Sequence, residues 1–233
     1  MKIKNIVEER INALWQTYKS RDFCKYPPLS VSEVPDEGII FIGLNPSLDK
    51  NVKNVSVSPD ANIEFYPLGV HKTENYAYFK KFSDIADKVQ LPWGHLDLLY
   101  MRETKQQGIR HLLEVEDGIN FIYQQLMVSK DILVNLLNEK KPLIFVVNNT
   151  LSRDFLGKDR PLDYSDDQQH WMDFRFKWSN ELGTYLYNGH PFFFCSMLTG
   201  QRALDIGSYE RLIWHIDFVK QKMNFNQPKN NLS

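Results

Sequence analysis

Four polar turns are the places where this sequence could do chemistry, because each one directly follows an apolar segment. Their side chains are mainly amides and hydroxyls, which can hold water or hydrogen-bond a polar ligand. The turns are Asn45-Pro46-Ser47, Arg102-Glu103-Thr104, Asn148-Asn149-Thr150 and Ser196 to Gly200. Each asparagine could also simply end a strand.

The cysteines and histidines do not indicate metal or redox chemistry. Cys24 and Cys195 are the only cysteines, and they lie far apart without the spacing of metal ligands. We therefore expect two reduced thiols rather than a disulfide or a zinc site. The histidines likewise lack ligand spacing, so we expect no metal and no other cofactor.

Length and charge limit the classes of protein that fit. The chain has 233 residues, 42% of them hydrophobic, which predicts one core and a single domain spanning residues 1–233. The net charge of −1 does not favour nucleic-acid binding, although a phosphate-facing rim of basic residues is possible. Its candidates, which could equally be solvated, are Lys80, Lys81, Arg102, Lys105 and Arg202. Without a secretory signal or an apolar membrane segment, we expect a cytoplasmic monomer.

Periodic apolar residues predict the elements that must position the turns. The expected helices are Ile3 to Tyr18, Asn75 to Val89, Glu116 to Asn138, and Ser208 to Lys222 with Ser208 as N-cap. The expected buried strands are Gly38 to Leu44, Leu96 to Met101, Pro142 to Val147 and Phe192 to Cys195. Residues 1–35 form an N-terminal helical extension in this scheme, residues 153–178 an irregular excursion, and residues 224–233 a frayed tail.

The last strand is predicted as one arm of a hairpin, because Asn188-Gly189 suits a type I′ turn after Thr184 to Tyr187. Strands that alternate with helices predict an α/β fold, here a three-layer α/β/α sandwich with a mainly parallel, four-stranded central sheet. Ligands of such sheets bind at the carboxyl ends of the strands, which is where the four turns lie.

The segment Phe41 to Ser47 resembles the first motif of the mismatch-specific and single-strand-selective branches of the uracil-DNA glycosylase superfamily. That motif is Gly-x-Asn-Pro-Gly at the end of the first strand, and Ser47 replaces its last glycine. Leu98 to Thr104 is similar to the strand ending in Arg-x-Thr of the mismatch-specific branch, and Ile144 to Asn149 takes the place of the third strand. The resemblance implies a DNA partner and hydrolysis of the N-glycosidic bond of a flipped uracil or related damaged base.

The resemblance also implies roles for residues near the motif. Asn45 would position the attacking water, while most of the acceleration would come from stabilising the departing base as an anion. An aromatic ring, Phe65 or Tyr66, could stack on the base. Arg102, Asn148 and Asn149 could also contact the substrate. The remaining pocket-lining residues of this motif are Gly43, Leu44, Pro46 and Ser47.

A second family motif, His-Pro-Ser-Pro after the last strand, has two possible positions. Mapping it on His190-Pro191 would leave Phe192 to Phe194 in water, at about 1.5 to 3 kcal/mol each. The hairpin avoids this cost and places the loop Ser196 to Arg202 at the motif's position. Thr199, Gln201 or Arg202 would then supply the hydrogen-bond donor, and Met197 or Leu198 would be the wedge into DNA or else part of the core. Gly200 completes the loop.

Two other classes of protein remain open at this point. A catalytically inactive module could keep the fold and bind a nucleic acid or a nucleotide, and an unrelated α/β enzyme could act on a small molecule. The glycosylase hypothesis requires Asn45 and the loop Ser196 to Arg202 to face one another across a single cleft at the carboxyl end of the sheet.

Overall fold

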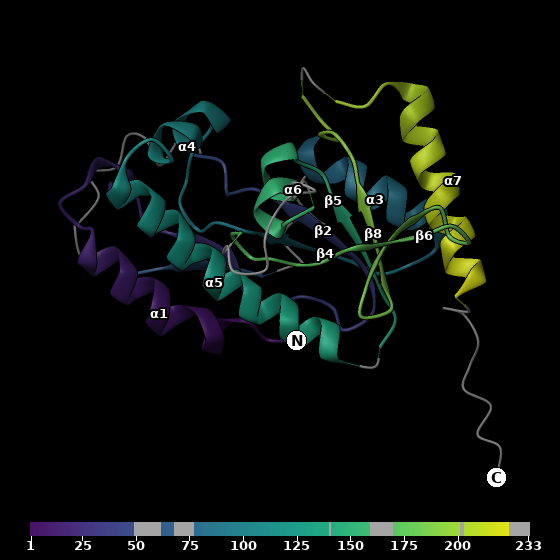
Figure 1. Cartoon of the computed structure of the whole chain (residues 1–233), viewed down its shortest axis with the longest axis horizontal. Coiled ribbons are helices and arrows are strands. Elements are labelled where there is room, and N and C mark those ends of the chain that lie inside the picture. Colours follow the sequence, from purple (N-terminus) through teal and green to yellow (C-terminus); the bar gives the residue numbers. More distant parts are fainter. Residues whose placement is uncertain (49–61, 68–76, 140, 159–169, 201–202, 224–233) are drawn as a thin grey trace, which may run out of the picture.

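The computed structural model describes residues 1–48, 62–67, 77–139, 141–158, 170–200 and 203–223 (Figure 1). Its helices are α1 (Lys4–Thr17), α3 (Ala77–Val89), α4 (Gln106–Leu112), α5 (Glu116–Asn138), α6 (Thr150–Leu156), α7 (Ile206–Lys222) and the short 3₁₀ helix η1 (Asp22–Cys24). Its strands are β1 (Leu29–Val31), β2 (Gly38–Gly43), β3 (Glu64–Tyr66), β4 (Trp93–Asp97), β5 (Leu143–Val147), β6 (Lys177–Ser179), β7 (Thr184–Tyr187) and β8 (His190–Phe194).

The main sheet has six strands in the order β4-β2-β5-β8-β7-β6. The first four are mutually parallel, whereas β7 and β6 are added antiparallel at one edge. The α/β class is therefore confirmed, but the sheet is larger and more mixed than the predicted four strands. The predicted hairpin is also confirmed, since Asn188 and Gly189 have φ angles of 48° and 79°, as a type I′ turn needs.

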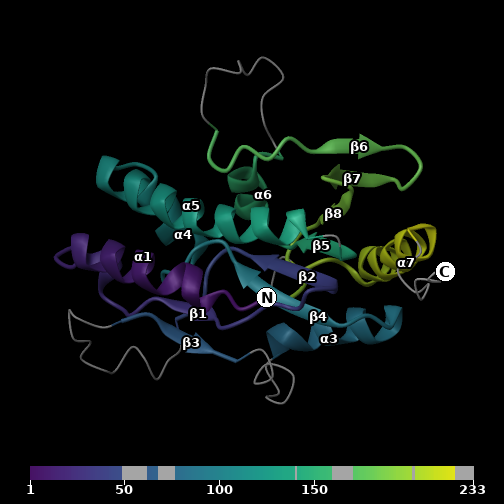
Figure 2. The same ribbon diagram turned by 90° about the horizontal axis from the view of Figure 1, so that it is seen from below.

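Strand β2 is buried on both sides, because helices pack on both faces of the sheet. Ile40 and Ile42 belong to a core cluster shared with α1 and α5. Ile39 and Phe41 point the other way, into a second cluster with α3 and α7. Figure 2 shows α1 and α5 near one face and α3 near the other. The alternation of side chains along β2 thus assigns the residues at its carboxyl end to defined faces.

The N-terminal helix α1 packs on the core, as its apolar stripe predicted. Its predicted apolar stripe is buried, including Val7, Ile11 and Leu14, and α1 packs against α5. Trp15 Nε1 donates to the carbonyl of Tyr26 at 2.9 Å, which fastens the helix to the following segment. Residues 1–35 therefore help to build the core that supports the parallel strands.

Three predicted elements have wrong boundaries, and one of them is the last strand, which is β8, His190–Phe194, and not Phe192 to Cys195. The second strand is β4, Trp93–Asp97, and not Leu96 to Met101. Its Gly, His and Asp interrupt the apolar run, so the more apolar segment that follows gave the stronger signal. That segment still runs beside β2, since the amide of Leu99 donates to the carbonyl of Leu44. Helix α7 begins at Ile206 rather than Ser208, because Asp205 is its N-cap and accepts the amide of Ser208 at 2.9 Å.

The excursion at 153–178 contains regular structure at both ends. Helix α6 overlaps its start and β6 overlaps its end, while residues 159–169, like the tail 224–233, lie outside the described residues. None of the helices that the structure describes has the length and apolar character needed to span a membrane.

Candidate functional site

The carboxyl ends of the four parallel strands place a row of residues side by side on the α3 face of the sheet. Gly43 is the direct register partner of Asp97, and Val147 pairs with Ile42 on one side and with Phe194 on the other. Asn148 follows Val147 and Cys195 follows Phe194, so these two residues lie level with Gly43 and Asp97. We call the set Asp97, Gly43, Asn148 and Cys195 the carboxyl-edge row.

Gly43 is the point in the row where three polar side chains converge. A Cβ atom at this position would lie 2.2 Å from Asp97 Oδ1, 2.9 Å from His95 Nε2 and 3.3 Å from the hydroxyl of Tyr78. No residue with a side chain fits without moving these groups. Glycine is therefore needed at this position for space, and the carboxylate, the imidazole and the phenol occupy the room that it leaves.

His95 lies beneath the row and is 2% exposed. Its Nε2 makes no hydrogen bond within the described part of the chain and lies 3.4 Å from Asp97 Oδ1. Its Nδ1 is 3.5 Å from the hydroxyl of Tyr66, and the rings of Tyr78 and Phe82 pack around the imidazole. A buried polar atom without a partner costs about 1 to 3 kcal/mol, which makes His95 an unusual core residue.

The two phenols beside Asp97 stay protonated at neutral pH. Burial raises the pKa of Tyr66 well above its usual value, and the negative charge of Asp97 raises it further. Tyr78 has a raised pKa for the same two reasons, although the Asn148 amide, 3.4 Å from its hydroxyl, acts in the opposite direction. Both side chains are therefore O–H donors that surround the carboxylate.

Cys195 ends the row but is not an activated thiol. Burial raises the pKa of its Sγ–H to about 12, and the thiol lies 3.6 Å from the carbonyl oxygen of Val147. A thiol in this state has almost no thiolate at neutral pH, so it is not a nucleophile. The expected reduced state of the thiol is consistent with the structure, where Cys195 and Cys24 are both free.

Asn45 follows β2 and locks two turns together. Its Nδ2 donates to the carbonyls of Pro46, Met101 and Glu103 at 2.9, 3.3 and 2.7 Å. Three carbonyls around one end of the amide identify that end as the nitrogen. Oδ1 is therefore the atom that remains to accept a hydrogen bond from a water or a ligand. Pro46 is buried beside it, whereas Ser47 is exposed.

Arg102 and Asn149 have structural partners that compete with their predicted roles. Arg102 is buried, donates through Nε to the carbonyl of Pro27 at 3.0 Å and forms an ion pair with Glu64. A buried, paired guanidinium is not an exposed phosphate contact. The Oδ1 of Asn149 accepts the amide of Leu151 at 2.8 Å and caps α6, so this asparagine is held by the helix.

The loop after β8 and Asn45 both lie at the carboxyl end of the parallel strands, since β2 and β8 run in the same direction with β5 between them. Leu198 is 3% exposed and belongs to the core, which favours the core interpretation over the wedge, whereas Met197 is exposed. Thr199 is half-buried, and Ser196 and Gly200 are exposed. The other two predicted residues, Gln201 and Arg202, lie outside the described residues.

The two predicted stacking aromatics differ. Phe65 packs partly against the core, and the ammonium of Lys4 lies 5.6 Å from its ring centroid. Tyr66 is the one that reaches the carboxyl-edge row, through His95 and Asp97. Leu44, the remaining residue of the first motif, is buried in the core.

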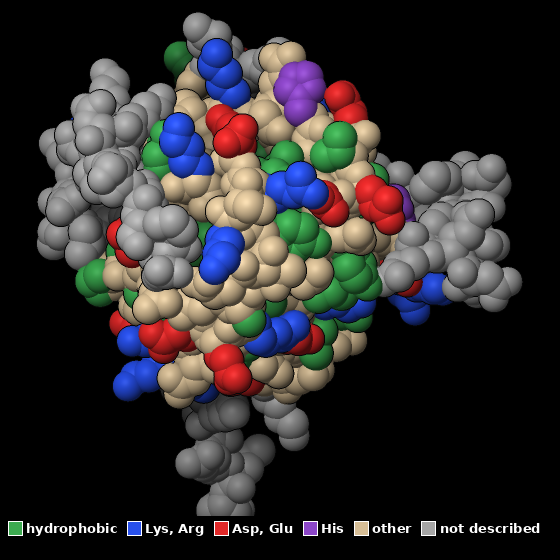
Figure 3. Space-filling view, turned by 90° about the vertical axis from the view of Figure 1, so that its left-hand side faces the viewer, with side chains coloured by type: hydrophobic (Ala, Val, Ile, Leu, Met, Phe, Trp, Pro, Cys, Tyr) green, Lys and Arg blue, Asp and Glu red, His purple; other side chains and the backbone are tan. Residues whose placement is uncertain are grey.

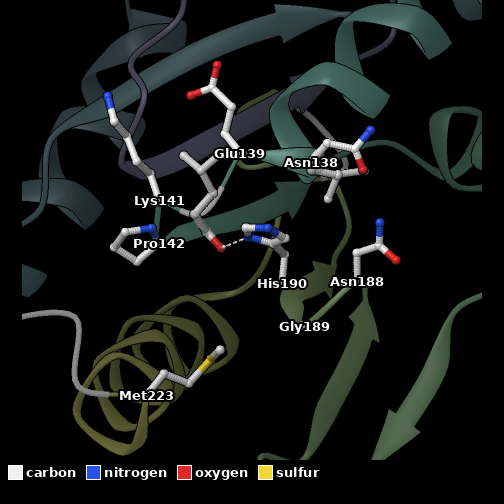
Figure 4. Close-up of a pocket in the computed structure, with 10 residues that line it drawn as sticks. Asn138, Glu139, Lys141, Pro142, Asn188, Gly189, His190 and Met223 are labelled. Carbon is white, nitrogen blue, oxygen red and sulfur yellow. Dashed lines mark hydrogen bonds between the residues drawn. The ribbon is translucent and has the colours of Figure 1, made fainter.

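His190 is placed at the start of β8, at the opposite end of the sheet, as the hairpin register predicted. It lines an open hollow of about 650 Å³ together with Asn138, Lys141 and Met223. Figure 4 shows its ring directed at the carbonyl of Leu143, with Nδ1 at 3.4 Å. Burial lowers the pKa of His190, so its imidazole is neutral at pH 7. This hollow shares no residue with the carboxyl-edge row.

The sequence argument missed the three residues that give the site its character, which are His95, Asp97 and Tyr78. A usable signal was present. His95 and Asp97 are two positions apart and so share one face of a strand. The signal was lost because the strand was placed three residues too late.

On the face drawn in Figure 3, basic and acidic side chains are interspersed, without a patch of one sign. Within the described ranges, no group of three or more His, Cys, Asp or Glu residues could hold a metal ion. Comparison of the chain with protein-family models, with curated proteins and with solved structures found no match.

Proposed function

We propose that this chain is a DNA-base glycosylase-like hydrolase, whose site at the carboxyl-edge row takes a flipped uracil or related base. The fold proposed with it is the three-layer uracil-DNA glycosylase-like sandwich, built on the four parallel strands. The observation that supports the proposal is the position of Gly43 to Ser47. This segment ends the interior strand β2, between β4, which ends at Asp97, and β5, which Asn148 follows.

The chemistry of these groups suits a neutral heterocycle. The amide of Asn148 offers both a donor and an acceptor, which is what recognition of a base edge requires. Tyr78 adds an O–H donor 3.4 Å from that amide. Asn45, with its nitrogen committed to three carbonyls, presents Oδ1 as the acceptor that holds the attacking water. These three side chains come from β5, α3 and the turn after β2.

A second candidate is a binding module that keeps the site without turnover. The observation that favours it is the absence of a ready phosphate contact at Arg102, whose guanidinium is paired with Glu64. On the face drawn in Figure 3 the basic side chains are interspersed with acidic ones, whereas duplex DNA is usually held by clustered Lys and Arg. Such a module would bind a nucleotide or a single-stranded end.

The test is a gel assay with single- and double-stranded oligonucleotides that contain one uracil. We expect abasic product from the wild-type protein and a rate lower by roughly 10²-fold or more in Asn45→Ala, the scale of losing a group that positions the reacting water. Asn138→Ala, at the opposite end of the sheet, is the matched control and should behave as wild type. No abasic product at high protein concentration would end the catalytic claim, and salt-sensitive binding without turnover would establish the second candidate.

A further inference from the structure

We infer that Asp97 is the general base of the proposed reaction, and that His95 is the residue that positions it. The inference rests on the proposed function and adds a catalytic group that the first motif does not supply. The Asp97 carboxylate and the Nε2 of His95, which has no hydrogen-bond partner among the described residues, converge over Gly43. Together they place a carboxylate over Gly43, at the β4 end of the carboxyl-edge row.

The proton balance of the reaction requires such a group. Water attacks C1′ of the sugar, the C1′–N bond breaks, and its electron pair leaves with the base as an anion. The attacking water must lose a proton to become the new hydroxyl at C1′. The neutral amide of Asn45 cannot accept that proton, but a carboxylate can, and it can later return the proton to the departed base.

Asp97 is the carboxylate that is free for this role among those described near the carboxyl ends of β2 and β4. Glu64 is paired with Arg102, and Glu103 Oε1 accepts the backbone amide of Lys105 at 2.8 Å. Within the described part of the chain, Asp97 has no such partner, and its one ion-pair contact there is the 3.4 Å approach to His95 Nε2. Its side chain is 11% exposed, compared with 2% for His95, so it is the outer member of the pair.

The surroundings of Asp97 favour a base whose position is fixed. Tyr66 from β3 and Tyr78 from α3 have raised pKa values, so they present protons and not a competing negative charge. Cys195 at the end of β8 is a thiol for the same reason. His95 packs between Tyr78, Phe79 and Phe82, which prevents its ring from turning away. The carboxylate therefore stands among neutral donors, with one imidazole behind it.

The first experiment measures single-turnover cleavage of uracil oligonucleotides across pH. Asp97→Asn should lower the rate by roughly 10² to 10⁴-fold and abolish the fall in rate at acid pH that protonation of the base causes in the wild type. His95→Gln should lower the rate less and keep that acidic fall. Asp131→Asn, which alters a surface carboxylate paired with Arg10, is the control and should match wild type. Cleavage by wild type with an unchanged profile in Asp97→Asn would overturn the inference and leave the proposed function standing.

The second experiment needs no turnover. Binding is compared for two oligonucleotides that carry an abasic-site analogue, one with a cationic pyrrolidine ring and one with a neutral tetrahydrofuran ring. The charge of Asp97 should make the wild-type protein prefer the cation by about tenfold, and Asp97→Asn should lose the preference. A wild type that binds neither analogue, shows no preference, or keeps its preference in Asp97→Asn contradicts the inference. A preference without cleavage of uracil would refute the proposed hydrolase and retain the anionic site.

Discussion

Among the described residues, two buried histidines lie at opposite ends of the sheet, and they differ in how their ring nitrogens are used. His190, at the amino end, lies 3.4 Å from the Leu143 carbonyl oxygen and beside an open hollow. His95, at the carboxyl end, is more deeply buried, yet its Nε2 has no hydrogen-bond partner among the described residues and faces the carboxylate of Asp97.

The size of a hollow and the presence of a histidine therefore do not by themselves identify a functional site. His190 satisfies its polar atoms with backbone groups that join the end of α5 to β5, as a structural residue does. His95 is held in an arrangement that costs stability and is not offset by any bond within the described chain. Such a cost is expected where ligand binding or catalysis uses the group.

The largest effect on the free energy of unfolding is expected at Gly43, over which the side chains of Asp97, His95 and Tyr78 converge. Gly43→Ala forces a methyl group to 2.2 Å from Asp97 Oδ1, so we expect a loss of about 1 to 3 kcal/mol in the free energy of unfolding, measured in urea. Gly207→Ala, whose Cβ would be 3.3 Å from Asp205 Oδ1, is the control and should change stability by less than about 1 kcal/mol. Equal effects at the two glycines would remove the argument for a crowded carboxyl-edge row.

The sequence predicted much of what surrounds this site. Unbroken apolar runs identified β2 and β5, and Asn188-Gly189 identified the hairpin. The site itself depends on strand register, which pairs Gly43 with Asp97 through contacts between residues far apart in the chain. Local periodicity does not contain that information.

The partnerships of Arg102 with Glu64 and Pro27 were unpredictable for the same reason. The short elements α4, α6 and β1 lack enough residues to show a period, so no pattern indicated them.

Asn148 and Asn149 are adjacent and carry the same amide, but we assign Asn149 a structural role and Asn148 a role in ligand binding. Asn149→Ala removes the cap of α6 and should lower the free energy of unfolding by about 1 kcal/mol. Asn148→Ala should cost less stability, since its amide makes a long 3.4 Å contact to Tyr78, but it should weaken binding of the abasic-analogue oligonucleotides. Urea unfolding and fluorescence anisotropy measure the two effects. The reverse pattern would exchange the two roles.

The pH dependence of the free energy of unfolding tests the state of His190, at the amino end of the parallel strands. Burial holds the folded-state pKa of His190 below its usual 6.5, so the unfolded chain binds the proton more readily. The stability from neutral His190 is therefore complete above about pH 6.5 and is lost as the pH falls through the lower folded value. Unfolding of wild type and His190→Gln, compared between pH 7.5 and about pH 5, should show a smaller decrease in the variant. Identical slopes would mean that His190 is not held neutral by the fold.

The smallest effect is expected at the thiols. Burial raises the pKa values of Cys24 and Cys195 to about 12, so both should react slowly with a thiol reagent at pH 8 in the folded protein and quickly in denaturant. A rapid reaction of Cys195 in the folded state, absent from Cys195→Ser, would show a more open carboxyl-edge row than the structure describes.

Imidazole nitrogen resonances show whether the ligand binds near His95 or near His190, because they report on both ends of the sheet in one sample. The protein is labelled with ¹⁵N-histidine and titrated with the pyrrolidine oligonucleotide, and His95→Gln and His190→Gln assign the signals. We expect the resonances of His95 to shift and those of His190 to stay in place. Shifts at His190 with none at His95 would contradict this expectation.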